Sequence, residues 1–369
     1  MLDNKVKILF LMQLPPPVHG ASMMNKYIKD SKKVNASFDA FFLPLSFAEK
    51  VDDIGKISLK KILKMIAFCF KLTNNLFKIK PKIVYFTIAP FGGAFYRDVL
   101  FVIIIKLFRK KIVFHLHGKG IAEESKSFIK KKIYQFVFKN TYVITLSKML
   151  DYDIRKVFNG KIYHLANGIE INNSYIKTNK NDRIKILYLS NLVKTKGVLD
   201  LVDALVILKD LKSNYEVNIV GNSADISIEE LKEMVINKNT ASKINILGPK
   251  YGEEKWQELC SSDIFVFPTY FKNECFPLVL LEAMQSGNAI ISTDNGAIEE
   301  IIINCGLIVP QNSPTDLAEA IKSLIINKDK VQALKEKSKK EFDEKYTLQI
   351  FEENFIKTIN SILNETLQS

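Results

Sequence analysis

Residues 273–287 read Asn-Glu-Cys-Phe-Pro-Leu-Val-Leu-Leu-Glu-Ala-Met-Gln-Ser-Gly, a polar start followed by an apolar run. Pro277 suits the first position of a helix, because its missing N–H would have no partner there. The backbone amides that follow would stay free to face an anion such as a phosphate. Glu274 would lie at the mouth of this helix, and Glu282 roughly 7 to 8 Å along it at about 1.5 Å per residue. The two carboxylates would accept hydrogen bonds from sugar hydroxyls on one side of the phosphate and from ribose hydroxyls on the other. The stretch therefore has the outline of a site for a nucleotide-sugar.

Strand patterns on both sides place this stretch in a series of α/β units. Five apolar strands are expected, each followed by a glycine, proline or polar turn, at 184–189, 216–220, 244–247, 264–267 and 289–293. Ligands of open parallel sheets lie beyond the carboxyl ends of the strands, so these turns predict one binding rim. The alternative for 273–287 is an ordinary buried helix with two surface glutamates, and the rim favours the binding site.

An earlier α/β series precedes it, with strands expected at 6–12, 82–87, 111–118, 142–146 and from 162. His19 and Gly20 follow the first strand in a proline-rich turn, and a helix from Met23 should come next. His117 ends the third strand. These residues fall where a substrate would approach, and His19 and Arg97 are the candidates for the acceptor side. A structural histidine and a plain turn are the alternatives.

The two series are similar to two Rossmann-like domains that face each other across a cleft, which predicts the α/β fold class. We expect an N-terminal domain over 1–172 and a C-terminal domain over 182–346, joined by a polar linker at 173–181. The helix at about 347–369 is a candidate to pack back on the first domain. Ligands favour clefts between domains.

Composition indicates an ordinary globular protein, with 47% hydrophobic and 25% charged residues in a chain of 369 that exceeds one core. The apolar run 99–105 is too short to span a bilayer, and the first strand lacks the cleavage site of a signal peptide. We expect a cytoplasmic protein. The four cysteines lack paired spacing and only four histidines are present, so neither a disulfide framework nor a zinc site is indicated.

The charge is uneven. Residues 1–180 contain 32 Lys and Arg against 12 Asp and Glu, and the remainder contains 21 against 28. A basic half suggests an anionic partner, and no nucleic-acid motif accompanies it. A lysine stripe on a helix over 59–80 suggests contact with the inner face of the cell membrane, at Lys60, Lys64, Lys71 and Lys78, with further runs at 109–111 and 126–132. Solvated surface lysines without function are the alternative.

The motifs resemble those of a GT-B glycosyltransferase, specifically the retaining glycosyltransferase family 4, also called group 1. The most specific part is the pair Glu274 and Glu282, which is similar to the family's Glu-x7-Glu motif and lies between matching segments at 263–269 and 282–287. Supporting matches occur in the family's order at Gly20, His117, the Asn167-Gly168 turn and Lys196-Gly197. The resemblance covers nearly the whole chain.

The resemblance implies that Glu274 contacts the donor sugar, Lys196 neutralises the departing nucleoside diphosphate and His117 lies near the reacting carbon. These three are the candidate catalytic residues. The candidate donor-binding residues would hold the phosphates, the ribose and the base, and they are Gly20, Asn191, Gly248, Pro249, Lys250, Cys275, Phe276, Pro277, Leu278, Val279 and Glu282.

Two residues depart from the family pattern. Asn191 stands where the family has an arginine, and asparagine cannot replace a bidentate phosphate partner, although Lys194 is a candidate substitute. Cys275 stands where the family has a glycine, and its side chain could narrow the choice of sugar.

The implied reaction is retaining transfer of a hexose from a nucleotide-diphosphate-sugar to a lipid-linked or cell-surface saccharide, as in polysaccharide biosynthesis. Lys196 can do the work of a cation, so we expect neither metal nor cofactor. Asp151 and Asp153 are expected to be helix-start carboxylates. Two alternatives remain open, a sugar-nucleotide 2-epimerase of the same fold and a degenerate, non-catalytic transferase.

Overall fold

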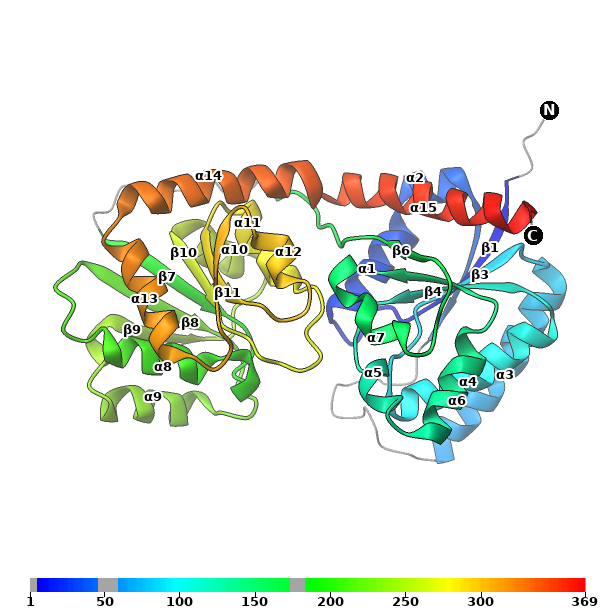
Figure 1. Cartoon of the computed structure of the whole chain (residues 1–369), viewed down its shortest axis with the longest axis horizontal. Helices are drawn as coiled ribbons and strands as arrows, with labels where there is room; N and C mark the ends of the chain where they lie inside the picture. The colour runs from blue at the N-terminus through cyan, green and yellow to red at the C-terminus, as the bar shows by residue number, and fades with distance from the viewer. Residues whose placement is uncertain (1–4, 46–58, 173–182, 369) are drawn as a thin grey trace. The chain divides into compact units, whose positions relative to one another are not determined.

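The computed structural model describes residues 5–45, 59–172 and 183–368, and the chain divides into two compact units. Unit 1 comprises Met1–Asn167 and Leu348–Ser369, and unit 2 comprises Gly168–Thr347. Each unit contains a six-stranded parallel sheet covered by helices (Figure 1). The prediction of an α/β chain with two Rossmann-like units is confirmed.

The division falls five residues before the predicted end of the first domain at 172. Ile169 forms an isolated bridge with Thr347, and the Asn172 N–H donates to Gln285 Oε1 at 2.5 Å, so this segment pairs within unit 2. The predicted linker at 173–181 lies outside the described residues.

The sheet of unit 1 has the order β2-β1-β3-β4-β5-β6. Its four inner strands are nearly continuous buried runs, as expected for a parallel sheet covered on both faces. They are β1 (Lys7–Met12), β2 (Asp39–Pro44), β3 (Ile83–Phe86), β4 (Lys111–Leu116), β5 (Tyr142–Thr145) and β6 (Ile162–His164). The strand order reverses between β1 and β3, so the turns after these two strands flank a switch point where α/β proteins bind ligands.

Helices cover both faces of this sheet. One face carries α3 (Leu59–Ile79), α4 (Gly92–Leu107) and α6 (Phe128–Phe138), whose Leu72, Phe101 and Val137 share one core with the strands. On the other face, Phe355 of the last helix lies against Phe10 and Tyr85, with ring centroids 6.4 and 5.5 Å apart. The remaining helices of this unit are α1 (Gly20–Asp30), α2 (Lys32–Ser37), α5 (Ile121–Glu124), the 3-10 turn η2 (Lys148–Leu150), α7 (Asp151–Arg155) and α15 (Leu348–Gln368).

Two local predictions for unit 1 were incomplete. β2 was not predicted, because Asp39 opens this edge strand, Pro44 ends it and most of its side chains are only half-buried. The helix expected from Met23 begins at Gly20, because His19 and Ser22 form a capping box: Ser22 N–H donates to His19 Nδ1 at 3.3 Å, and His19 N–H donates to Ser22 Oγ at 3.0 Å.

The sheet of unit 2 has the order β12-β11-β10-β7-β8-β9, which is the doubly wound order of dinucleotide-binding folds, with its reversal between β7 and β10. Its strands are β7 (Ile184–Leu189), β8 (Tyr215–Val220), β9 (Ile244–Gly248), β10 (Ile264–Phe267), β11 (Ala289–Thr293) and β12 (Gly306–Val309). The last of these was not predicted, because it has only four residues and one of them is buried.

Helices flank the sheet of unit 2 as well. They are η3 (Lys194–Lys196), α8 (Val198–Ile207), α9 (Ile228–Asn237), η4 (Ala241–Lys243), α10 (Gly252–Ser261), α11 (Leu278–Gln285), α12 (Ile298–Ile302), α13 (Pro314–Ile325) and α14 (Lys328–Lys345). A core that includes Tyr188, Leu201 and Ile321 joins the sheet to α8 and α13. Among the helices of the described ranges, none combines the length and the apolar character needed to cross a membrane.

Candidate functional site

The turns after β7 and β10 lie next to each other at the reversal of the strand order in unit 2. The β7 turn runs through η3 to Gly197, and the β10 turn runs from Pro268 to Pro277. A backbone hydrogen bond joins the two turns, in which Tyr270 N–H donates to Thr195 O at 2.8 Å. The predicted binding rim is therefore built at the switch point of this sheet.

An ion pair connects these two turns. Lys196 Nζ lies 2.5 Å from Glu274 Oε2, and both side chains are largely buried. The ammonium also lies 4.6 Å from the ring centroid of Phe271 and 5.5 Å from that of Phe267. The structure thus brings together two of the three predicted catalytic residues, 78 positions apart in the sequence.

Gly197 allows the two turns to approach this closely. Its φ of 80° lies in the left-handed region, and a Cβ there would come within 2.1 Å of Pro268 O. Tyr188 O–H donates to Lys196 O at 3.4 Å from β7. Backbone contacts therefore fix the position of the Lys196 main chain, and the ion pair with Glu274 fixes the position of its ammonium.

The helix predicted from Pro277 begins one residue later. Pro277 is the N-cap of α11 with an extended backbone, and its carbonyl accepts from Leu280 N–H at 3.1 Å. By the geometry of a helix start, the amides of Leu278 and Val279 have no partner one turn earlier, and both residues are half-buried. These two amides are the phosphate-binding candidates at the helix start, as proposed from the sequence.

Cys275 and Phe276 are buried between Glu274 and the helix. The carbonyl of Cys275 accepts from Ala297 N–H at 2.8 Å, and a Cβ on Gly296 would lie 2.5 Å from Glu274 O. The ring of Phe276 packs edge-on against Tyr346 at 5.9 Å. These contacts hold the backbone of the stretch in place, and the effect of Cys275 on sugar choice stays a prediction.

Glu282 has a cationic partner that sequence reasoning missed. Lys255 Nζ of α10 lies 2.6 Å from Glu282 Oε1, and both side chains are partly buried. The pair is 27 positions apart with no local motif to indicate it. Lys255 fixes the carboxylate that the resemblance assigns to the ribose.

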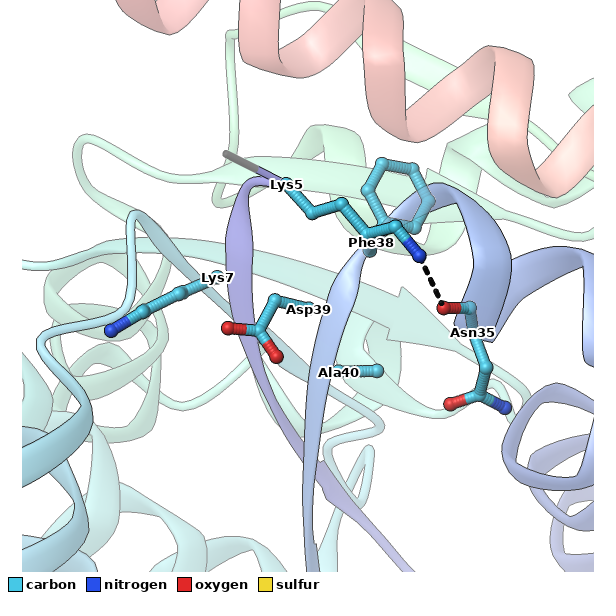
Figure 2. Close-up of a pocket in the computed structure, with 6 residues that line it drawn as sticks. All are labelled: Lys5, Lys7, Asn35, Phe38, Asp39 and Ala40. Carbon is cyan, nitrogen blue, oxygen red and sulfur yellow. Dashed lines mark hydrogen bonds between the residues drawn. The ribbon is translucent and has the colours of Figure 1, made fainter. Parts of the chain in front are cut away.

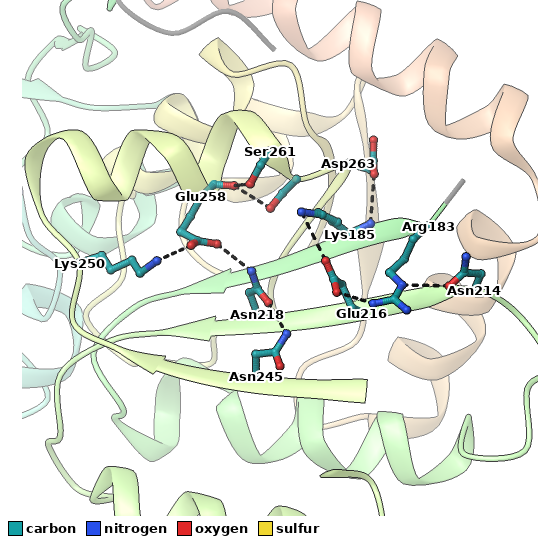
Figure 3. A network of polar contacts seen from close by, with 11 residues as sticks. Arg183, Lys185, Asn214, Glu216, Asn218, Asn245, Lys250, Glu258, Ser261 and Asp263 are labelled. Carbon is teal, nitrogen blue, oxygen red and sulfur yellow. Dashed lines mark hydrogen bonds and ion pairs between the residues drawn. The ribbon is translucent and has the colours of Figure 1, made fainter. Parts of the chain in front are cut away.

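Gly248, Pro249 and Lys250 lie at the end of β9, where the resemblance places the base. Gly248 has a φ of 71° and its carbonyl accepts from Gly221 N–H. Lys250 pairs with Glu258 of α10, whose other oxygen accepts from Asn218 at 2.8 Å (Figure 3). The Lys250 ammonium therefore ties α10 to the sheet, which leaves the backbone of this turn as the candidate contact for the base.

Asn191 is exposed at the start of the β7 turn, and its carbonyl accepts from Val193 N–H at 2.7 Å. Lys194, the proposed substitute for the family's arginine, is also exposed, and its backbone N–H donates to Asp225 at 3.1 Å. Neither observation tests a phosphate contact, so both roles stay predictions.

Three aromatic groups meet at the carboxyl ends of the unit 1 strands. His117 follows β4, and its ring centroid lies 4.1 Å from that of His115, whose Nδ1 is 2.5 Å from Tyr85 Oη. Both nitrogens of His117 are buried, and no described residue hydrogen-bonds to them. Burial, and secondarily the nearby His19, lowers the pKa of His117 to about 3. A neutral imidazole with unused nitrogens suits a hydroxyl ligand.

The other unit 1 candidates have structural partners. His19 is the N-cap of α1 and Gly20 is its first residue, so both belong to a helix start rather than to the predicted loop. Arg97 Nη2 lies 2.6 Å from Oδ1 of Asp98, which is completely buried and also accepts from Ala89 N–H at 2.9 Å. The first function of Arg97 is therefore to neutralise a buried carboxylate.

The two aspartates of the Asp-Tyr-Asp segment occupy the first turn of α7, which confirms their placement at a helix start. Asp153, however, caps a different helix: it accepts from the backbone amides of Gly120, Ile121 and Ala122 at 2.9, 3.1 and 2.9 Å. Asp151 contacts His164 at 3.1 Å. Within the described ranges, no group of three or more histidine, cysteine or acidic side chains is arranged to hold a metal ion.

A shallow hollow lined by Lys5, Lys7, Asn35 and Asp39 lies at the opposite edge of unit 1 (Figure 2). Lys5 and Lys7 precede or open β1, and Asp39 opens β2, so this hollow is at the amino ends of the strands. Ligands of parallel sheets bind at the carboxyl ends, and we assign no role to the hollow.

The family model described as glycosyl transferases group 1 matches residues 171–341, which are nearly all of unit 2. Over this range the chain is similar to the group 1 glycosyl transferases. The matched range contains the Lys196–Glu274 pair, α11 and the Lys255–Glu282 pair. The resemblance to group 1 glycosyl transferases that the motifs predicted is borne out for this range, and the retaining class stays a prediction.

Two relatives are similar to parts of this chain. An uncharacterized glycosyltransferase of Methanocaldococcus jannaschii is 28% identical over 235 residues, which are 63% of each chain. The capsular polysaccharide biosynthesis glycosyltransferase CapM of Staphylococcus aureus is 25% identical over 213 residues, which are 54% of each chain. The matched segment thus spans less than two thirds of the length of either relative.

Solved structures match this chain over almost its whole length. The Anabaena protein HepE in complex with UDP has a TM-score of 0.77 at 18% identity, over 96% of this chain and 100% of HepE. WaaG, a glycosyltransferase involved in lipopolysaccharide biosynthesis, has a TM-score of 0.64 at 15% identity, over 94% of this chain and 98% of WaaG. The two-unit fold is GT-B, as predicted.

Proposed function

We propose that the protein transfers a hexose from a nucleotide-diphosphate-sugar to a lipid-linked or cell-surface saccharide, at the inner face of the cell membrane, with retention at the anomeric carbon. The observation that carries the proposal is the Lys196–Glu274 pair beside the start of α11, at the switch point of unit 2. The match of residues 171–341 to the group 1 model and the similarity to CapM support saccharide synthesis as the setting.

In the proposed reaction the anomeric C–O bond to the diphosphate breaks, and its electron pair goes to the diphosphate oxygen. The acceptor hydroxyl attacks from the face that the diphosphate leaves, and its proton passes to a phosphate oxygen. Lys196 and the amides of Leu278 and Val279 stabilise the negative charge that develops on the diphosphate. No step requires a metal or a cofactor.

Donor binding would rearrange the ion pair. Lys196 and Glu274 neutralise each other at 2.5 Å. A bound diphosphate offers Lys196 a stronger partner, and the sugar hydroxyls give Glu274 donors to replace the ammonium. The pair would therefore hold both side chains near the positions that the reaction uses.

A thermal-shift screen of nucleotide-sugars tests donor binding. At a concentration of 100 times Kd, a donor stabilises the native state by about 2.7 kcal/mol. For a unit of this size that is a shift of roughly 5 to 10 °C. Glu282→Gln should reduce the shift, and Glu229→Gln on the exposed side of α9 serves as the matched control. Equal shifts in both variants would contradict the ribose assignment.

Transfer itself is tested with the donor identified in the screen and a set of lipid-linked acceptors. NMR of the product should show the anomeric configuration of the donor, and excess chelator should leave the rate unchanged. An inverted product or a complete loss with chelator would contradict the corresponding part of the proposal. An epimerised donor formed without acceptor would favour the 2-epimerase alternative.

A further inference from the structure

Helix α3 carries an exposed apolar row that faces away from the core of unit 1. Leu63, Phe70 and Phe77 are 59%, 73% and 69% exposed. Their spacing of seven residues places them on one side of the helix, whereas Leu72 and Leu76 on the other side are buried in the core. A row of exposed phenylalanines is unfavourable in water and indicates a surface that interacts with a protein, a ligand or a membrane.

A row of lysines runs beside the apolar row. Lys64, Lys71 and Lys78 each follow one of the apolar residues by one position, so the two rows lie about 100° apart around the helix. Lys71 and Lys78 are exposed, and Lys64 is half-buried. Lys60 of the predicted stripe lies outside the residues whose side chains are described. Adjacent apolar and basic rows are typical of a helix that lies in a membrane interface.

The neighbouring helices α4 and α6 continue this surface. Leu107 at the end of α4 and Phe128 at the start of α6 are 76% and 73% exposed, and Ile129 is similarly exposed. An apolar groove between the two helices is lined by residues that include Ile103 and Phe136. Of the 24 large apolar side chains found exposed in the described residues, 12 lie on α3, α4 and α6, so the apolar exposure is concentrated on one helical layer.

The net charge of these three helices is strongly positive, although Lys130 is paired with Glu124 of α5 at 2.6 Å. Helices α3, α4 and α6 contain ten lysines and arginines and one acidic residue, Asp98. Asp98 is completely buried and paired with Arg97, so it adds no negative charge to the surface. Lys132 lies 5.5 Å from the ring centroid of Phe128, which places a cation directly beside an exposed apolar group.

These charges select among the partners that an apolar face could bind. A second copy of the chain would place this face against itself in a two-fold interface, where lysines would oppose lysines. Nucleic acid would match the charge but would leave the apolar rows in water. An anionic bilayer matches both, because its acyl boundary accepts the apolar side chains and its headgroups attract the lysines.

We propose that the outer face of α3, α4 and α6 binds the surface of an anionic lipid bilayer. The proposal names the contact surface for the expected membrane partner, and its test needs neither donor nor acceptor. It can therefore fail while donor binding to unit 2 succeeds, or the reverse.

The test is flotation of the full chain with vesicles of phosphatidylcholine alone or with 30% phosphatidylglycerol added. We expect binding to the mixed vesicles only. Phe70→Ser/Phe77→Ser should weaken it by about tenfold or more, from the loss of buried apolar area. Lys71→Gln/Lys78→Gln should weaken it by roughly 25-fold, at about fivefold per lysine. High salt should reproduce the lysine effect.

Control variants remove exposed residues of the same types from unit 2. Ile207→Ser/Ile236→Ser and Lys337→Gln/Lys340→Gln should bind vesicles as the wild type does. Equal binding to both kinds of vesicle, or an equal loss in the control variants, would overturn the proposal. So would a dimer in the absence of vesicles that Phe70→Ser/Phe77→Ser dissociates. Unchanged thermal unfolding shows that a variant still folds.

Discussion

Removing both partners of the Lys196–Glu274 pair should destabilise unit 2 about as much as removing either one alone. Lys196→Met keeps an apolar side chain against Phe271 but leaves the buried carboxylate without its cation. Glu274→Gln leaves the ammonium without its anion. In Lys196→Met/Glu274→Gln neither uncompensated charge remains, so the second substitution should add little to the cost of the first.

The magnitude follows from the geometry. Two unit charges about 4 Å apart attract by about 4 kcal/mol at an effective dielectric constant of 20, and desolvation offsets part of this. The side chains retain 19% and 10% of their exposure, so water still reaches them. We expect a loss of about 2 to 3 kcal/mol in the unfolding free energy for each single variant and a similar loss for the double variant. The coupling free energy is then about 2 kcal/mol.

Urea unfolding followed by the fluorescence of Trp256 measures this coupling, because the only tryptophan of the chain lies on α10 of unit 2. The pair Lys238 and Asp203 is the matched control. Its atoms are also 2.5 Å apart, but both side chains are more than 40% exposed. Exposed pairs contribute about 0.2 to 1 kcal/mol. A coupling for Lys196–Glu274 no larger than that of the control pair would refute the reasoning.

Two further predictions concern the backbone and pH. Gly197→Ala should cost about 2 to 4 kcal/mol in unfolding free energy, because its Cβ would meet Pro268 O. Gly252→Ala is the control, and it should cost about 1 kcal/mol because Gly252 also has a positive φ but open space around it. Similar losses of Tm in the two variants would contradict this. His117 has a lowered pKa of about 3, so between that value and 6.5 the unfolded state binds more protons and stability falls as pH falls. His117→Asn should flatten this dependence by up to about 1.4 kcal/mol per pH unit, and an unchanged slope would contradict the buried neutral state.

The parts predicted correctly are those encoded in local sequence. The strand Ile264–Phe267 is a continuous apolar run, and Ile184–Leu189 is an apolar run interrupted only by Lys185. A turn follows each of them, which is why the predicted bounds match those of the structure. The apolar runs of β12 (Leu307–Val309) and of the edge strand β2 (Ala40–Leu43) are short and mostly only part-buried, and the positions of these strands depend on pairing with β11 and β1. The start of α1 depends on a histidine acting as an N-cap, which is not a common capping residue.

The candidate site was predictable as a set of residues but not as a set of contacts. The spacing of Glu274 and Glu282 is recognisable in the sequence. No sequence pattern indicates that Lys255 pairs with Glu282 or that aromatic rings surround Lys196. Lys250 follows β9 as the sequence predicted, but its ammonium forms an ion pair with Glu258 that the sequence did not indicate. Such pairings arise from the packing of α10 on the sheet, which no local pattern encodes.

Under the proposed function, the two ion pairs at residues 273–287 determine which ligands the site can bind. Both carboxylates assigned to hydroxyl groups, Glu274 and Glu282, are already held by lysines. A sugar hydroxyl alone is a weaker partner than an ammonium, so a free sugar would have to break an ion pair without compensation. A diphosphate compensates Lys196 directly, because it brings negative charge to the start of α11, next to the released ammonium. The site therefore favours ligands in which sugar and diphosphate arrive together, which is the property that a transferase needs of its donor.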